Sequence, residues 1–519
     1  MKTIFSTFGI LIVASFAIGQ VKPDRIPNGY SVQTIDTPAG VSFGVGGMEF
    51  APNGDLYVCT REGDVWQYKT SKKEWSLFAD GLHESLGIWI DSKSSEVFVI
   101  QRGEITQLID SDENGDADFY KTINADWGVT DNYHEYAFGL VRDSKGNFYG
   151  TLNTSLSWPG WARSEKWNIG RVWTKGYPDT DGKMGRATKY RGWGFQVTPK
   201  GKFVPFASGM RSPAGIGISK DDELFFTDNQ GDWEASSSLH HIVKGRFHGH
   251  PSSLMDHPDY KGKDLNEIPI EEYKELWSPP AVWIPHGELA NSPGEPIFDY
   301  TGGKFGPFEG QMFIGDQSRS NIMRVSLDKV GGEYQGVIFD FINRLQTGCI
   351  RHVFDKDGAL WVGQTGRGWG SAGGKEYGLQ KVMWDGSTLP FAIHDVKLEP
   401  NGFRVAFTKP VNREVAEDPN NFQVDRWGYH YHPRYGSPKV DNMKLVPKKV
   451  TVSKNGKNVF LEMDLEKERV YKFNLQKIQT HEKESLVNHF AWYTLNRLKS
   501  PSYVISLPST TFSSGLYLT

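Results

Sequence analysis

The chain repeats one short phrase six times, and this repeat constrains the fold more than any other feature. Each copy has a small residue, an apolar run, an acidic or Lys/Asn-Gly turn and then an apolar–aromatic pair, with a degenerate fifth copy. Turn residues of this kind accept positive φ, so each phrase predicts a β-hairpin. The copies lie at residues 46–58, 87–99, 139–150, 215–226, 305–316 and 351–362.

Six hairpins at this spacing predict an all-β fold, with a six-bladed β-propeller over residues 30–388. The 57 Gly and 31 Phe residues agree with many short aromatic strands joined by tight turns. Two stacked β-sandwiches would not explain why the phrase returns six times. From Phe391 an alternating pattern with two Asn-Gly hairpins predicts an immunoglobulin- or fibronectin-like β-sandwich over residues 389–485. Residues 486–519 should pack back on the body and end in a flexible tail.

The first nineteen residues predict a secretory signal peptide. A lysine precedes an apolar run that ends in Ala17, Ile18 and Gly19. The run is short for a bilayer span, and no later segment approaches about 20 apolar residues, so we expect no transmembrane segment. The protein should therefore be exported, to the periplasm or the extracellular space.

Charge and cysteine content narrow the partners and the fold. A formal net charge of -4 without a long basic run argues against nucleic acid or an anionic membrane as the partner. With only Cys59 and Cys349, the fold is not held by a cysteine framework. These residues are either two buried thiols or a bridge between the first and last repeats.

Residues that precede the inner strand of each propeller blade gather at one mouth of the central tunnel. Neutral histidines beside arginine forks suit removal of a hydroxyl proton and binding of the resulting oxyanion. Each such residue also fits a turn cap or a carboxylate pair, with Glu84 or Glu135 as the partner. The repeat alignment gathers His83, His134, Arg211 and His286 before inner strands, and Arg351 within the last inner strand.

A separate acidic loop between the second and third copies predicts a structural calcium site. Oxygen ligands at every second position, with Gly115 at the sharp turn, follow the start of an EF-hand-type loop. The usual terminal Glu and the flanking helices are missing, and a solvated acidic turn is the alternative. The candidate ligands are Asp110, Asp112, Asn114, Asp116 and Asp118.

The order and spacing of five blocks carry a family resemblance over roughly residues 40–385. The blocks are His134 leading GLVRDSKGNFYGT, then GMRSPAGIGISKDDELFFTDNQGDW, KGRFHGHP, FGPFEGQMFIGD and RHVFDKDGALWVGQTG. Together they resemble the soluble glucose/sorbosone dehydrogenases, which are six-bladed propellers that use pyrroloquinoline quinone (PQQ) and calcium. The chain is more similar still to secreted propeller proteins known as membrane-bound dehydrogenase domains.

The resemblance implies a role for each matching residue. His134 matches the general base, Arg211 an arginine near the reducible carbonyls, and Arg351 an arginine that binds the PQQ carboxylates. The cofactor-holding calcium loop of the family matches Asp228, Asn229, Gln230 and Gly231. The chain departs from the family pattern at Ser212 and Ala214, which replace Asn and Gln, and at Asn153, which replaces an acidic residue.

These observations favour an exported oxidoreductase that acts on a sugar or related alcohol and passes electrons to an external acceptor. The substrate is expected to be a small molecule or a glycan. A glycan lyase or hydrolase that uses His/Arg acid–base chemistry is one alternative, and a non-catalytic carbohydrate-binding propeller is another. An indole-rich segment at residues 156–173 suits either stacking on sugar rings or burial between blades.

Overall fold

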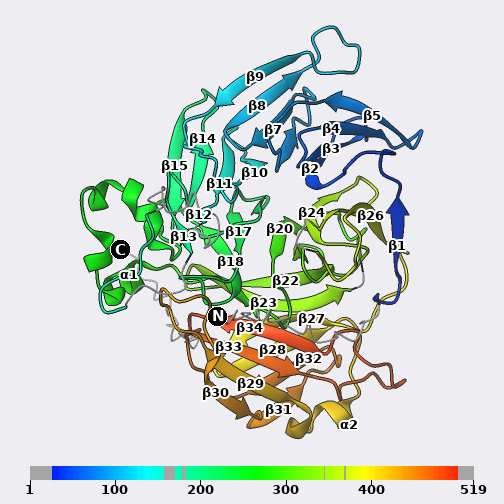
Figure 1. The fold of residues 1–519 in the computed structure, drawn as a ribbon. Coiled ribbons are helices and arrows are strands. Elements are labelled where there is room, and N and C mark those ends of the chain that lie inside the picture. The colour runs from blue at the N-terminus through cyan, green and yellow to red at the C-terminus, as the bar shows by residue number, and fades with distance from the viewer. Residues whose placement is uncertain (1–25, 157–169, 178–182, 344, 367–369, 501–519) are drawn as a thin grey trace, which may run out of the picture.

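The computed structural model describes an almost entirely β-structured chain (Figure 1). The described residues are 26–156, 170–177, 183–343, 345–366 and 370–500. The predicted signal peptide and the tail beyond residue 500 lie outside them. Within this part of the chain, no helix combines the length and the apolar character needed to cross a membrane.

Six four-stranded antiparallel units follow one another along the chain. The first three consist of β2 (Val45–Phe50), β3 (Leu56–Thr60), β4 (Val65–Lys69) and β5 (Glu74–Ala79); β6 (Ile88–Ile90), β7 (Val97–Gln101), β8 (Glu104–Ile109) and β9 (Phe119–Asn124); and β10 (Ala137–Arg142), β11 (Phe148–Leu152), β14 (Trp193–Val197) and β15 (Phe203–Ser208). The last three consist of β16 (Ile216–Ile218), β17 (Leu224–Asp228), β18 (Ser237–Ile242) and β19 (Val282–Ile284); β20 (Pro293–Phe298), β21 (Met312–Asp316), β22 (Asn321–Val330) and β23 (Glu333–Ile342); and β24 (Cys349–Phe354), β25 (Leu360–Thr365), β26 (Tyr377–Trp384) and β1 (Tyr30–Ile35).

The six units are arranged as the blades of a propeller, as the repeat predicts. The inner strand of each unit contacts that of the next, from β2 through β6, β10, β16 and β20 to β24, and β24 contacts β2. The N-terminal strand β1 pairs with β26 and so supplies the fourth strand of the last blade. Figure 1 shows the inner strands facing a common centre.

Glycines of the repeated phrase lie where neighbouring inner strands approach backbone to backbone. A Cβ atom on Gly47 would lie 2.7 Å from the Cα atom of Gly87 in the next blade. On Gly87 it would overlap the carbonyl oxygen of Gly139, and on Gly217 of the fourth copy it would lie 2.2 Å from the carbonyl oxygen of Pro296 in the fifth blade. The glycines of the phrase therefore serve contact between blades as well as the hairpin itself.

The fifth blade explains why its phrase is degenerate. Its inner strand is β20, and residues 299–311 form a loop before β21, so the phrase covers only a loop and the outgoing strand. Phe305 and Phe308 of this loop are buried, and the ring of Phe305 packs against Tyr30 and Phe341. The apolar residues thus fill a core rather than form a strand.

The C-terminal β-sandwich shares a sheet with the fifth blade. Strand β23 pairs with β34, so one eight-stranded sheet runs in the order β20-β21-β22-β23-β34-β33-β29-β30. Val337 and Phe339 of β23 belong to the same buried core as Phe403 and Phe473 of the sandwich. The added strands are β34 (Phe490–Leu495), β33 (Arg469–Asn474), β29 (Gln423–Gly428) and β30 (Val440–Leu445), faced by β27 (Ile393–Glu399), β28 (Gly402–Phe407), β32 (Asn458–Glu462) and β31 (Lys449–Val452).

Short helices occur only in connecting segments of the described chain. Most of them lie in the long insertion between β18 and β19. The α-helices are α1 (Ile270–Leu276) and α2 (Arg413–Ala416), the 3-10 helices are Pro251–Asp256, Pro258–Tyr260, Leu265–Glu267 and Pro419–Asn421, and a small ribbon pairs β12 (Ser155–Leu156) with β13 (Met184–Gly185).

The two cysteines are free thiols, so the ring-closing bridge that the sequence left open does not form. Both are buried, Cys59 in the first blade and Cys349 in the last. Each thiol faces a backbone carbonyl, that of Ser85 and that of Thr347 respectively. Burial raises the pKa of Cys59 to about 12, so this thiol stays protonated and behaves as a small apolar group.

We predict that Gly87→Ala destabilises the fold, because the added methyl group meets the backbone of the third blade and neither backbone can move aside. Overpacking of this kind lowers the free energy of unfolding by about 3 kcal/mol or more. Urea denaturation measures the loss. Gly103→Ala in the same blade is the matched control, because its Cβ atom meets nothing within 4 Å. Equal midpoints for the two variants would contradict the role of Gly87.

Candidate active site

A cavity of about 710 Å³ lies where the inner strands of blades three to six begin. This volume is within the range of small-molecule sites. Several of the predicted residues meet in its wall, although they come from different blades. The predicted residues that line it are His134, Arg211, Asn229, Gln230 and His286.

The ring of His134 is held by a backbone carbonyl. Its Nδ1 atom lies 3.0 Å from the carbonyl oxygen of Thr154. A carbonyl only accepts, so Nδ1 carries the hydrogen, and in the neutral ring Nε2 then has the lone pair. The Nε2 atom lies 3.4 Å from the hydroxyl of Ser212, to which Asn153 donates at 3.3 Å. Asn153 thus reaches His134 through Ser212.

The two glutamates proposed as histidine partners make other contacts. Glu84 pairs with Arg61 at 2.9 Å and with Arg102 at 3.0 Å. Glu135 is buried and accepts hydrogen bonds from Thr130 and Ser155. His83 lies in the exposed loop before β6 and does not line the cavity, so the structure does not bring it to the other predicted residues.

Arg211 lies at the buried side of the cavity, next to Asp232, an acid that no sequence motif predicted. Its Nε atom donates to Asp232 at 3.2 Å, and both side chains are at least nine-tenths buried. The guanidinium lies flat against Gly231, where any Cβ atom would overlap it. The backbone of Gly231 therefore makes the space for Arg211 and does not line the cavity.

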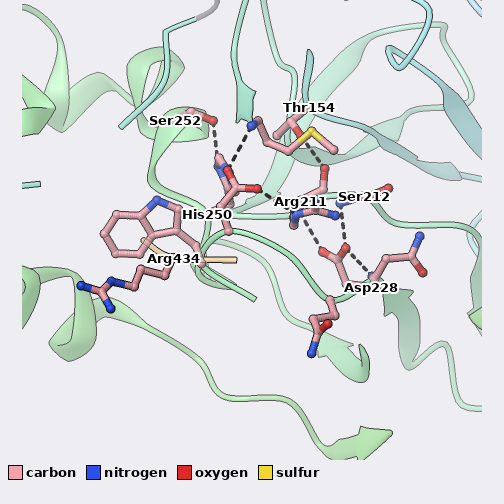
Figure 2. A network of polar contacts seen from close by, with 12 residues as sticks. Thr154, Arg211, Ser212, Asp228, His250, Ser252 and Arg434 are labelled. Carbon is pink, nitrogen blue, oxygen red and sulfur yellow. Dashed lines mark hydrogen bonds and ion pairs between the residues drawn. The ribbon is translucent and has the colours of Figure 1, made fainter. Parts of the chain in front are cut away.

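Asp232 is itself held by three neighbours. It accepts hydrogen bonds from the amide of Met184 at 3.1 Å and from Nε2 of His250 at 3.2 Å, besides Arg211. The other ring nitrogen of His250 accepts from Ser252 at 2.9 Å (Figure 2). Hydrogen bonds from His250 and the charge of Arg211 outweigh burial and lower the pKa of Asp232. The arginine is thus fixed by a buried chain of polar contacts.

Asp228 fixes the backbone of the same segment. Its carboxylate accepts from the amides of Arg211 and Ser212, both at 2.7 Å (Figure 2). Burial raises its pKa to about 6, although these amide bonds oppose the shift. Of the predicted cofactor-binding loop, Asn229 and Gln230 line the cavity, whereas Asp228 supports the wall from behind.

Arg351 does not line this cavity, and its guanidinium is used by the fold. It donates to the carbonyl oxygens of Gly46, Ala214 and Leu86, which belong to three other blades. A carboxylate oxygen of Glu295 lies 3.5 Å from Nε of Arg351. Glu295 also lines a second cavity, of about 540 Å³, at the opposite ends of the inner strands. Arg351 therefore links inner strands across the centre, and its donors are not free for cofactor carboxylates.

The acidic loop forms a hydrogen-bonded turn. Asp110 accepts from the amides of Asn114 and Gly115, and Asp118 accepts from Ser111. In the described part of the chain, no three His, Cys, Asp or Glu residues are placed to hold a metal ion. The carboxylates of Asp110, Asp112 and Asp118 thus accept from amides and a hydroxyl within the loop.

Two cavity residues carried no signal in the sequence. Lys183 precedes β13, and Tyr435 belongs to the loop between β29 and β30 of the sandwich, far along the chain from the blades. The charge of the cavity wall is positive. None of the described lining residues is Asp or Glu, whereas Arg211 and Lys183 are cationic. Desolvation at the wall and the charges of Arg319 and Arg211 lower the pKa of His286. The cavity thus favours ligands with negative or electron-rich groups.

Behind the wall, Glu234 is a buried acid that holds its proton near neutral pH. It accepts from Ser238 at 2.7 Å, and burial raises its pKa to about 8. His240, 3.7 Å from this carboxyl, is also neutral because burial lowers its pKa to about 4. This arrangement avoids an uncompensated charge beside Arg211 and Asp232.

We predict that Glu234→Gln removes part of the pH dependence of stability. Between about pH 5 and pH 8 the unfolded carboxyl has lost a proton that folded Glu234 still holds, so the free energy of unfolding of the wild type falls by up to about 1.4 kcal/mol per pH unit. Gln cannot titrate, so the free energy of unfolding of the variant rises relative to that of the wild type as pH rises. Urea denaturation at pH 5, 6.5 and 8 measures the difference, and parallel curves would refute the assignment.

Comparison with known proteins supports the resemblance seen in the motifs. The glucose/sorbosone dehydrogenase family model matches residues 197–369. No curated protein matches the chain. Similar solved structures include a Thermus thermophilus protein described as an oxidoreductase of the glucose dehydrogenase type, with 15% identity over 68% of this chain and 100% of that chain and a TM-score of 0.44. The PQQ-bound aldose sugar dehydrogenase of Streptomyces coelicolor has 15% identity over 69% and 99% of the two chains, with a TM-score of 0.42. The PQQ domain of a Coprinopsis cinerea pyranose dehydrogenase has 11% identity over 69% and 96%, with a TM-score of 0.47. Over residues 197–369 the chain is therefore glucose/sorbosone dehydrogenase-like, as its motifs predict.

Proposed function

We propose that the chain is an exported oxidoreductase that oxidises a sugar or related alcohol in the cavity beside His134. One observation carries the proposal: Nε2 of His134 has a lone pair, fixed by the Nδ1–H bond to Thr154, in a cavity that also contains Arg211. The match to the dehydrogenase family over residues 197–369 supports the same reaction class.

The geometry suits removal of a hydroxyl proton. A substrate hydroxyl donates its proton to Nε2 of His134 and replaces the contact with Ser212, which is long at 3.4 Å. The carbonyl of Thr154 then stabilises the charged ring through Nδ1–H. As the C–O bond becomes a carbonyl, the hydride on the same carbon leaves to the electron acceptor, and the guanidinium of Arg211 favours the negative charge that develops on oxygen.

Three lining residues suit a carboxylated quinone at the same site: two are cationic, and the third offers an amide oxygen that accepts. Arg211 and Lys183 line the cavity, no described lining residue is a carboxylate, and the buried amide oxygen of Asn229 has no partner in the described chain. These three residues would hold PQQ. A bound PQQ would supply the two-electron acceptor for this oxidation. Arg351 is excluded from this set because its guanidinium already donates to backbone carbonyls of three other blades.

Calcium and export stay predictions of the sequence. Asp110 and Asp118 of the acidic loop accept from an amide and a hydroxyl of the same loop, and the structure adds no support for a cation there. In this proposal calcium stabilises a loop and takes no part in the proton transfer. The signal peptide over residues 1–19 is the basis for the expected periplasmic or extracellular location.

We predict that His134→Asn lowers kcat for sugar oxidation by roughly 10²–10⁴-fold. Asn retains a donor for the Thr154 carbonyl but offers no base, so the fold should persist. Dye reduction in the presence of PQQ, calcium and a panel of sugars measures the rate. His83→Asn is the matched control, because His83 is exposed and outside the cavity.

Other outcomes of this assay identify the alternative functions. Release of unsaturated or reducing ends from a glycan without an electron acceptor would show a lyase or hydrolase. Sugar binding that His134→Asn leaves unchanged, with no turnover, would show a non-catalytic binding propeller. Either outcome would overturn the proposed oxidation.

We predict that Arg211→Lys weakens PQQ binding by about tenfold or more. Lysine keeps the positive charge but lacks the planar fork that binds a carboxylate through two donors. Absorbance titration of the purified protein with PQQ measures the affinity without any substrate. Arg319→Lys is the control, because Arg319 donates to Gly287 and does not line the cavity. Equal affinities for wild type and Arg211→Lys would remove Arg211 from the cofactor site.

A further inference from the structure

One loop of the sandwich contacts the fourth blade of the propeller. This loop, residues 429–439 between β29 and β30, is hydrogen-bonded to the turn after β17. The amide of Gly436 donates to the carbonyl of Gly231, and that of Ser437 to the carbonyl of Ala235, both at 2.8 Å. The loop is thus fixed on the segment that supports Arg211.

Two further features hold the loop in this position. Tyr431 stacks on Trp277 with ring centroids 4.8 Å apart, and its hydroxyl donates to the carbonyl of Gly249 at 2.6 Å. Gly436 has φ +63°, and a Cβ atom there would lie 2.8 Å from Gln230. Glycine thus favours both the left-handed backbone at this position and the close approach of the loop to the cavity wall.

Tyr435 at the tip of this loop lines the cavity. The Cζ atom of Arg211 lies 5.3 Å from its ring centroid, a cation–π contact that orients the ring. The residue remains 46% exposed, and among the Tyr and Phe residues that line the cavity in the described chain it is the only exposed one. A fixed aromatic ring that stays open to a cavity is suited to contact a ligand.

We propose that Tyr435 is a ligand-binding residue that stacks on the apolar face of a saccharide ring, so that the sandwich completes the binding site of the propeller. The saccharide class rests on the proposed function. The C–H face of a pyranose packs on an aromatic ring, while its hydroxyls reach polar lining residues such as Asn229 and His286. Because Arg211 and the loop already orient Tyr435, little conformational entropy is lost on binding.

Calorimetric titration with neutral monosaccharides and disaccharides tests this role in the full chain, without cofactor. We expect Tyr435→Ala to weaken the affinity of the saccharide that binds best by about tenfold, and Tyr435→Phe to keep it within about threefold. Tyr435→Leu, which keeps apolar bulk without a ring, should behave like the alanine variant. Tyr300→Ala is the matched control: Tyr300 is 41% exposed and lies near Lys220, but outside this cavity.

The inference fails if the wild type binds none of the saccharides, or if Tyr435→Ala binds as tightly as the wild type. It also fails if Tyr435→Leu keeps full affinity, since a ring is then not required. These results are distinct from a failure of the proposed oxidation: saccharide binding that depends on Tyr435, with no dye reduction, would support the binding role alone. Normal KM values in Tyr435→Ala, with kcat lost in His134→Asn, would support the oxidation alone.

Discussion

The structure depends on the close backbone approach of six inner strands. Glycines such as Gly47 and Gly87 let neighbouring blades meet without side chains between them. Arg351 then links the inner strands at the centre of the propeller by donating to backbone carbonyls of three other blades. Because a buried guanidinium is costly unless its donors are satisfied, this residue is tied to the propeller geometry itself.

The candidate active site is a consequence of this packing. Residues at the start of the inner strands are brought to one cavity, where His134 and Arg211 are each fixed by partners outside it. The partners of Arg211 form a buried chain through Asp232 and His250. In the proposed reaction, these groups would not need to reorient when charge develops on a substrate. The polar residues behind the wall are therefore part of the site although they do not face it.

The sandwich is joined to the propeller more closely than a separate module would be. Strand β34 extends the sheet of the fifth blade, and the two parts share one buried core. This junction fixes the loop that carries Tyr435 beside the fourth blade. A second domain thus supplies part of the cavity wall, which links the stability of the sandwich to the shape of the site.

The sequence by itself determined five of the six inner hairpins, the sandwich and the likeness to sugar dehydrogenases, because turn chemistry and strand alternation are encoded within about ten neighbouring residues. In the fifth blade the phrase covers a loop and β21, and the inner strand β20 lies before it. It also placed His134 and Arg211 at corresponding points of the repeat. The tertiary structure alone decided that Arg351 turns into the centre, that His83 stays outside and that Asp232 and Tyr435 complete the site. Side-chain direction and the meeting of strand edges depend on contacts between residues hundreds of positions apart, which no local pattern records.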